Sequence, residues 1–330
     1  MLAELRRCTR IIGLLGILAL AGLLQACGAT KVFYNQAPDY FAYWYLDGHF
    51  DFTEAQSLQV KDGLTQLQAW HRQTQLPGYI DALQKLQRQM PSDMDAGTAC
   101  ALFADLRRKL IAVADQAEPA AAAVVGTLGA DQLVQLERRF ALGNAHFQGD
   151  FLEGTLKEVR DKRFQQAVSR AEMLYGPLDD MQLAVIGRRI DQSRFDATLS
   201  YAERLRRQQD ALQTLRPLIA GQATPETTQA ALHGLFERRR NSPDPVYRDY
   251  RNQLTQEACE TFADLHNSTT AAQRSSAVET LNGYEQDFRA LNAQQPLRAC
   301  HAAGAGIGVV SPAARPTSPC HARPSRYAGS

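Results

Sequence analysis

The sequence predicts an all-α fold, a multi-helix antiparallel bundle of roughly eight to ten helices after a cleaved signal. Apolar residues recur at spacings of three and four along most of the chain, which is typical of helices that bury one face. No comparable stretch alternates with the period of two that a half-buried strand requires. Helix caps and Pro or Gly corners separate the apolar stripes.

Residues 1–26 are predicted to be a lipoprotein signal peptide. Three arginines precede an apolar run of 14 residues, which is the order of a secretory signal. A helix needs roughly 20 residues to cross about 30 Å of hydrocarbon, so a permanent span is the weaker interpretation. The run ends in LQAC at Cys27, which resembles the bacterial lipobox. The resemblance implies cleavage before Cys27 and acylation there, and two or three acyl chains anchor a protein stably.

Residues 27–52 form the segment between the anchor and the helical domain. Gly28 follows Cys27 instead of Asp, which favours the outer membrane, periplasmic face, as the location. From Phe33 to Phe52, nine of twenty residues are Phe, Tyr or Trp. Such rings are typical of the lipid headgroup zone, but we favour a short helix that buries Phe41 and Trp44 as the cap of the bundle.

Residues 53–296 are predicted to form the helical domain. Thr53 with Gln56, and Thr270 with Gln273, fit the capping box. Corners are expected at Leu76-Pro77-Gly78, Gly129, Gly176-Pro177, Pro225 and Asn241 to Pro245. The apolar stripes are Val60, Leu64, Leu67 and His71; Leu102, Phe103, Leu106, Leu110 and Val113; Leu133, Leu136, Phe140 and Phe147; Leu199, Ala202, Leu205, Leu212, Leu215 and Ile219; and Val278, Leu281, Phe288 and Leu291.

The cysteines left after cleavage predict a disulfide in an oxidising compartment. Cys300 and Cys320 lie in residues 297–330, a tail rich in Ala, Gly, Pro, Ser and Arg that we expect to be unstructured. We therefore expect Cys100 to pair with Cys259; the alternative is two buried free thiols.

The charge of the mature body argues against nucleic-acid binding. Of 36 Lys and Arg, three lie in the signal and four in the tail; of 35 Asp and Glu, one lies in the signal. The remaining 29 basic and 34 acidic residues give a net charge of −5. Local basic clusters are interpreted as solvated helix faces balanced by Glu203 and Glu237, with contact to anionic headgroups as the alternative. These clusters are Arg188-Arg189, Arg206-Arg207 and Arg238-Arg239-Arg240.

No local signature of zinc hydrolysis, thiol redox exchange or serine esterase chemistry occurs. The best candidate binding site is Trp70-His71-Arg72, although three consecutive helical residues point in different directions. The run HNST from His266 resembles a base next to a nucleophile but is better explained as helix capping. We expect no catalytic residue, cofactor or metal.

Several stretches resemble a family of proteobacterial lipoproteins of unknown function. They are VFYNQAPDYFAYWYLDGHFDFTEAQ, WHRQTQLPGY, YGPLDDMQ and LHNSTTAAQR. The resemblance implies an anchored helical periplasmic domain and supplies no activity. More weakly, FTEAQ, LGADQ and LDDMQ are similar to the L-T-x-x-Q motifs of small helical periplasmic chaperones, although helix capping alone would explain them.

The sequence therefore predicts a lipid-anchored binding or scaffold module for envelope proteins on the periplasmic face of the outer membrane. Its partners would be membrane lipid, through Cys27, and an envelope protein. The alternatives are a chaperone-like binder of unfolded clients and, less favoured, an envelope hydrolase with a dispersed site.

Overall fold

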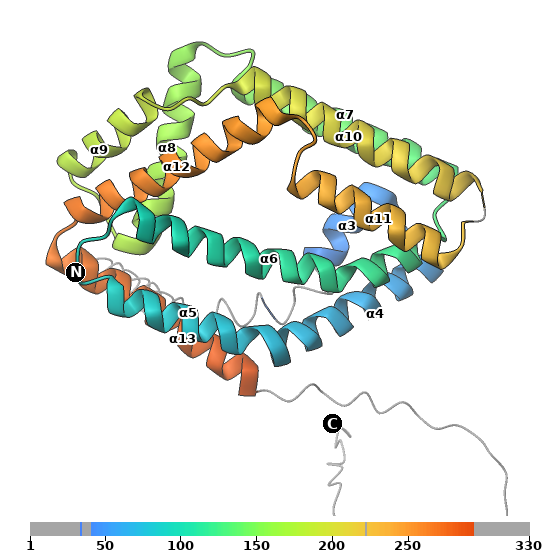
Figure 1. Ribbon diagram of the computed structural model, residues 1–330, viewed down its shortest axis with the longest axis horizontal. Coiled ribbons are helices and arrows are strands. Elements are labelled where there is room, and N and C mark those ends of the chain that lie inside the picture. Colours follow the sequence, from blue (N-terminus) through green and yellow to red (C-terminus); the bar gives the residue numbers. More distant parts are fainter. Residues whose placement is uncertain (1–33, 35–40, 222, 294–330) are drawn as a thin grey trace, which may run out of the picture. The chain divides into compact units, whose positions relative to one another are not determined.

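The computed structural model describes residue 34 and residues 41–221 and 223–293. The chain divides into two units, Met1–Gln295 and Pro296–Ser330, and every described residue lies in the first (Figure 1). The described ranges contain helices and no strand, which confirms the all-α prediction. The helices are α3 (Tyr43–Phe50), α4 (Glu54–Trp70), η2 (His71–Gln75), α5 (Leu76–Gln89), α6 (Ala96–Val125), α7 (Ala130–Phe151), α8 (Leu156–Tyr175), α9 (Asp180–Asp191), α10 (Ala197–Ala220), α11 (Pro225–Arg240), α12 (Pro245–Ser268) and α13 (Ala271–Ala293). The predicted signal, Cys27 and the tail after residue 296 lie outside the described residues.

Two hydrophobic cores lie near opposite ends of the long helix α6. Ala99, near the beginning of α6, belongs to a core shared by α8, α9, α12 and α13, in which Tyr175 and Ile186 are almost fully buried. Ala122, near its end, belongs to a second core shared by α7, α10 and α11. Helix α6 therefore connects two separate apolar clusters.

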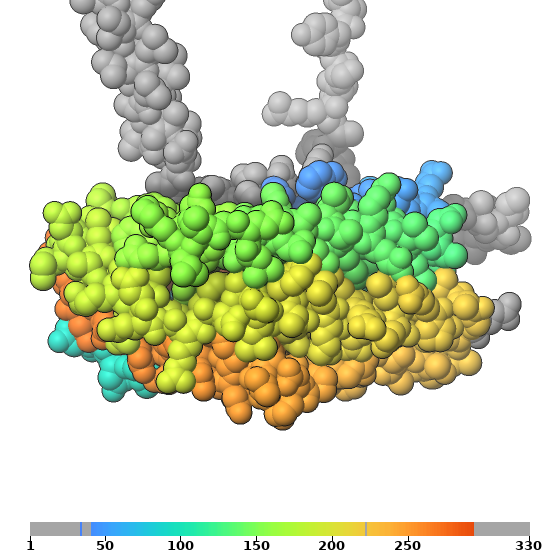
Figure 2. Space-filling model, turned by 90° about the horizontal axis from the view of Figure 1, so that it is seen from above, coloured from blue at the N-terminus to red at the C-terminus, as the bar shows by residue number. Residues whose placement is uncertain are grey.

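The helices pack in a closed circuit of neighbouring pairs. Helix α5 packs on α13, α13 on α8, α8 on α9, α9 on α12 and α12 on α6. From α6 the circuit continues through α11, α10, α7 and α3 to α4, which joins α5 through η2. Figure 2 shows α7 in green and α10 in yellow running side by side, which agrees with their contact.

Paired glutamines join the beginnings of α4 and α7. Gln56 and Gln132 each occupy the third position of a capping box, as the sequence predicted for Gln56. Their side-chain amides donate to each other at 3.1 and 2.8 Å. Each amide also donates to a carbonyl just before the partner helix, Gln56 to Thr127 at 2.7 Å and Gln132 to Asp51 at 3.3 Å. Capping alone does not account for these glutamines, because each side chain also donates a hydrogen bond to a backbone carbonyl just before the other helix.

The same arrangement joins the beginnings of α9 and α13. Gln182 and Gln273 donate to each other at 2.7 and 2.9 Å. Gln182 also donates to the Ser268 carbonyl at 3.2 Å and Gln273 to the Pro177 carbonyl at 2.8 Å. One glutamine pair thus lies beside each hydrophobic core.

The helical path does not end at Leu76-Pro77-Gly78, so the corner predicted there is wrong. Helix α4 continues through the π-helical turn η2, His71–Gln75, directly into α5. Pro77 lies in the first turn of α5, where its missing N–H does not break a regular α-helical bond. A π turn inserts an extra residue into a helix and is one of the recognised causes of a change of axis. Where the sequence predicted an interruption, the structure has a local change from α-helical to π-helical geometry.

Cys100 and Cys259 form a disulfide in the structure, with their Cα atoms 5.1 Å apart. The bridge joins α6 to α12 across 159 positions of the sequence. It lies in the first core, where Cys259 is fully buried.

Two apolar stripes are only partly buried, and this corrects the sequence analysis. Leu106 and Leu110 of α6 are exposed, at 50% and 59%. On α10, Ala202 and Leu205 are also exposed, whereas Glu203 between them is buried. The stripe prediction fails there because α10 presents a charged residue, held by ion pairs, to the interior.

The aromatic segment does not bury its rings as expected. Phe41 is 43% exposed and Trp44 is 76% exposed, so the prediction that both are buried is wrong. Tyr45 is 64% exposed. Among the described residues, no helix has the length and apolar character needed to cross a bilayer.

Candidate functional site

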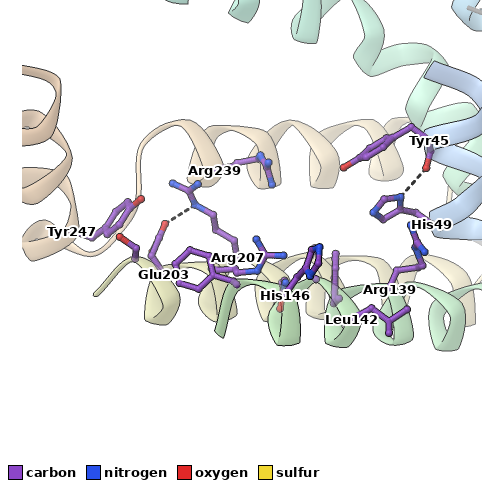
Figure 3. A pocket seen from close by; sticks show the side chains of 16 residues that line it. Tyr45, His49, Arg139, Leu142, His146, Glu203, Arg207, Arg239 and Tyr247 are labelled. Carbon is purple, nitrogen blue, oxygen red and sulfur yellow. Dashed lines mark hydrogen bonds and ion pairs between the residues drawn. The ribbon is translucent and has the colours of Figure 1, made fainter. Parts of the chain in front are cut away.

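A cavity of about 600 Å³ lies between α3, α7, α10, α11 and the beginning of α12 (Figure 3). Its walls come mainly from α7 and α10, which contribute three arginines and His146 to the lining. Arg239 of α11 and Arg207 of α10 project into the same space, as Figure 3 shows. Tyr45 and His49 of α3 lie at the opposite end of the cavity from Tyr247 of α12 in Figure 3. The Nδ1–H of His49 donates to the Tyr45 carbonyl at 2.8 Å.

The guanidinium of Arg204 lies against Gly143 of α7. A Cβ added at Gly143 would lie 2.5 Å from a terminal nitrogen of Arg204, so a larger residue there would displace the end of this side chain. The Nε–H of Arg204 donates to the side-chain oxygen of Asn144 at 2.7 Å, and Gln208 donates to the same oxygen at 2.9 Å. The hydrogen-bond partner of the Arg204 guanidinium is a neutral amide, which does not compensate its positive charge.

Glu203 is the acidic residue of the cavity lining, and it is already paired. Arg206 donates to its two oxygens at 2.7 and 3.0 Å, Arg207 donates at 2.7 Å, and the Ser242 hydroxyl donates at 3.1 Å. Burial alone would raise the pKa of the Glu203 carboxyl, but the hydrogen bonds from Arg206 and Arg207 outweigh burial and lower it. Glu203 is therefore an ionised anchor for two arginines and is unsuited to donating a proton near neutral pH.

The cavity carries excess positive charge. Four arginines line it, and the side chains of Arg139 and Arg239 form no hydrogen bond or ion pair with any described residue. Arg204 is bonded to an amide, and Arg207 shares Glu203 with Arg206. A partly enclosed site of one sign attracts ligands of the opposite sign, because low-dielectric walls focus the field. The geometry is that of a binding site for a negatively charged group.

The one serine of the lining is held by structural hydrogen bonds. The Ser200 hydroxyl donates to the Asp196 carbonyl at 2.7 Å, one turn earlier in α10, and lies 2.9 Å from the Tyr250 hydroxyl. The Tyr250 hydroxyl is itself bonded to the backbone of Asp196. These bonds link the beginnings of α10 and α12.

The candidate residues Trp70, His71 and Arg72 lie at the junction of α4 and η2, outside the cavity lining. All three are half-buried. His71 and Arg72 both contact Tyr34: His71 Nδ1 lies 2.9 Å from the Tyr34 hydroxyl, and the Arg72 guanidinium lies 5.6 Å from the Tyr34 ring. Burial lowers the pKa of His71 and raises that of Tyr34. The Trp70 ring lies beside His71, with centroids 6.5 Å apart.

The HNST run is structural. His266 is fully buried; its Nε2–H donates to the Ser92 carbonyl at 2.8 Å, and its Nδ1 accepts from the Tyr175 hydroxyl at 2.9 Å. The hydroxyls of Ser268 and Thr269 donate to backbone carbonyls of the preceding turn. Both ring nitrogens of His266 are used, so it is not placed to activate either hydroxyl.

The sequence analysis missed the cavity residues as a site, although two of its basic clusters contain them. Arg207 and Arg239 belong to the clusters Arg206-Arg207 and Arg238-Arg239-Arg240. The balancing role assigned to Glu203 and Glu237 is confirmed, because they pair with Arg206, Arg207 and Arg240. The description as a solvated face is wrong for Glu203, which is buried. Arg139 and Arg204 were not singled out, although Arg139 follows Arg138 directly, because arginines are common on the exposed faces of helices.

The fold and the cavity define an all-α protein with two hydrophobic cores and a basic cavity lined mainly by α7 and α10. A family of unknown function, DUF6279, matches residues 48–248, more than half of the chain. The chain belongs to this family. The matched range contains every lining residue of the cavity except Tyr45. Neither the curated proteins nor the solved structures gave a match.

Proposed function

We propose that this protein is a proteobacterial lipoprotein that serves as a binding or scaffold module for envelope proteins. Acylated Cys27 anchors it in the outer membrane, facing the periplasm. The order of charges and apolar residues before Cys27 and the LQAC sequence support the anchor. The Cys100–Cys259 disulfide supports an oxidising compartment, because such bridges are rare where thiols are kept reduced.

The basic cavity is the observation that carries the binding role. Arg139 and Arg239 hold uncompensated charge in a space of about 600 Å³, which is within the usual range of ligand sites. Guanidinium groups bind carboxylates through two parallel hydrogen bonds. The partner segment that fits this cavity is acidic, with carboxylates that reach Arg139 and Arg239.

Binding explains the lining better than catalysis does. A general acid or base needs a pKa near the working pH, whereas the Glu203 pKa is lowered by two arginines. Ser200 donates its proton to a backbone carbonyl. We therefore propose a role without turnover.

A chaperone-like role is the second candidate, and the glutamine pairs favour it. Gln56, Gln132 and Gln182 occupy the positions that made three stretches similar to L-T-x-x-Q motifs, and each pairs with a glutamine of another helix. In this alternative the clients are unfolded envelope proteins.

Cross-linking of the tagged protein in living cells, followed by mass spectrometry, tests the binding role. We expect one or two partners at near-stoichiometric yield and their loss in the double variant Arg139→Gln/Arg204→Gln. Arg138→Gln is the matched control, because Arg138 is adjacent to Arg139 on α7 and exposed like it, but lies outside the cavity lining. A broad set of captured proteins that is unchanged by the double variant would favour the chaperone-like role and refute the cavity as the scaffold site.

Membrane fractionation and labelled palmitate test the anchor separately. Cys27→Ala should abolish palmitate uptake and release the protein from membranes. If the variant still fractionates with membranes and neither form takes up palmitate, the lipoprotein assignment is wrong.

A further inference from the structure

A second cavity, of about 350 Å³, lies between α6, α10, α11 and α12. Five arginines and four apolar residues line it, and no acidic residue does. Arg207 and Arg239 also line the first cavity, whereas Arg107 and Arg251 line only the second. The two spaces can therefore be tested separately.

Three of the five arginines are not neutralised. Arg240 pairs with Asp115 and Glu237, and Arg207 pairs with Glu203. Arg107, Arg239 and Arg251 form no ion pair with any described residue. Arg107 donates to the Arg240 carbonyl at 3.2 Å, a bond that leaves its charge intact.

Two further observations concern the arginines of this cavity: one concerns neighbouring charges, and the other concerns a donor without a partner. Burial lowers the pKa of Arg251, and the neighbouring charges of Arg107 and Arg207 lower it further, while Tyr247 and Glu203 act in the opposite direction. One terminal nitrogen of Arg207, Nη2, is buried without a hydrogen-bond partner among the described residues. A buried donor without a partner raises the free energy of the protein, and an oxygen ligand would satisfy it.

The charge indicates the class of ligand. Three unpaired guanidinium groups exceed what one carboxylate neutralises, whereas a phosphate monoester carries −1.5 to about −2 at neutral pH and has three acceptor oxygens. The apolar lining indicates what is attached to the phosphate. Leu110 is 59% exposed beside Ile111 and Phe236, so an apolar group has a surface to cover next to the arginines.

We infer that the second cavity binds a phosphate group carried on an apolar chain, with Arg107, Arg207, Arg239 and Arg251 on the phosphate and Leu110, Ile111 and Phe236 on the chain. This site does not depend on the anchor. It shares Arg239 with the protein-binding site proposed above, whereas Arg107 and Arg251 belong to the second cavity alone. A lipid headgroup and a free phosphate share the anionic chemistry, and the apolar contact distinguishes them.

Calorimetric titration of the purified full chain at pH 7.5 tests the inference with three probes: hexyl phosphate, inorganic phosphate and hexanoate. Hexyl phosphate should bind at one site per chain, at least about tenfold more tightly than either other probe. Equal affinity for hexyl and inorganic phosphate would overturn the apolar half of the inference and leave a free-phosphate site. Equal affinity for hexanoate would overturn the phosphate assignment.

Variants locate the site. Arg251→Gln and Arg107→Gln should each weaken hexyl phosphate binding about tenfold or more. Arg108→Gln, at the next position of α6 with a side chain 69% exposed, should change it less than twofold. Arg139→Gln should also leave it unchanged, because Arg139 lines only the first cavity. No binding, or binding that Arg251→Gln does not weaken, would overturn the inference.

Thermal unfolding separates ligand binding from a structural role. Without ligand, Arg251→Gln should not lower the melting temperature, because it removes like-charge repulsion from Arg107 and Arg207. Hexyl phosphate should raise the melting temperature of the unsubstituted protein and not that of the variant. A lowered melting temperature of the ligand-free variant would show that Arg251 is structural and would overturn its assigned role.

Discussion

The buried carboxylate of Glu203 should contribute strongly to stability, and Glu203→Gln tests this. Its side chain is only 3% exposed, while those of Arg206 and Arg207 are 27% and 22% exposed. Removing one partner of a buried ion pair costs about 3–5 kcal/mol, because the other charge is left without compensation. Glutamine keeps one acceptor oxygen, and both arginines retain some access to water. We therefore expect the free energy of unfolding to fall by about 2–3 kcal/mol.

Urea unfolding at several pH values measures this effect and its origin. Hydrogen bonds from the arginines hold the Glu203 pKa below its ordinary value of 4.5 in the folded protein. The stabilisation from ionised Glu203 is therefore fully present above pH 4.5 and is lost as the pH falls through the folded-state pKa. The difference in unfolding free energy between the unsubstituted protein and Glu203→Gln should be largest near pH 7 and should shrink below pH 4.5.

Glu237→Gln is the matched control. Glu237 pairs with Arg240 three residues later, but its side chain is 51% exposed. Exposed pairs contribute about 0–1 kcal/mol, so this variant should lose less than about 0.5 kcal/mol at any pH. A loss below about 1 kcal/mol for Glu203→Gln at pH 7, or a loss that stays constant down to pH 3, would refute the reasoning.

Three further outcomes are expected. Gln132→Leu should lower the free energy of unfolding by about 1–3 kcal/mol, because it removes both hydrogen bonds that buried Gln56 exchanges with Gln132; urea titration measures this, and an unchanged midpoint would contradict it. Reduction should raise the intact mass by two hydrogen atoms and, because the Cys100–Cys259 loop spans 159 positions, lower stability by up to about 5 kcal/mol in the chain-entropy model. Burial lowers the pKa of His266 below 6.5, so its ring should stay neutral in NMR spectra as the pH falls through 6.5, and stability should decline below that pH as the unfolded state gains the proton. Protonation of folded His266 at pH 6.5 would contradict this.

The fold class could be predicted because it depends on local patterns. The capping boxes at Thr53 and Thr270 form as expected, because each uses a hydroxyl and an amide three residues apart. Their second role could not be predicted. The partners Gln56 and Gln132 are 76 positions apart, and no local rule shows that two helix beginnings meet.

Four of the five predicted helix interruptions coincide with helix boundaries, and only the one at Leu76-Pro77-Gly78 is wrong. Proline in the first turn of a helix is compatible with an unbroken chain, so Pro77 marks a change from π to α geometry. Pro119 and Pro217 lie inside α6 and α10, where the same residue type does not end the helix either. Proline limits hydrogen bonding, but tertiary packing decides whether the chain turns.

The cavity could not be predicted, because it is lined by charged residues, whereas apolar periodicity places only apolar residues in the interior. Apolar periodicity assigns charged residues to solvent, yet α10 turns Glu203 inward and leaves Ala202 and Leu205 exposed. This reversal is stable because Arg206 and Arg207 neutralise the carboxylate from the same helix, at spacings of three and four that the sequence displays. Once Glu203 is fully used by this local network, the arginines that other helices bring to the cavities, Arg139 and Arg239 among them, have no anion left among the lining residues. The internal pairing that makes a buried charge tolerable on α10 is thus what leaves the cavities positive and open to an external anion.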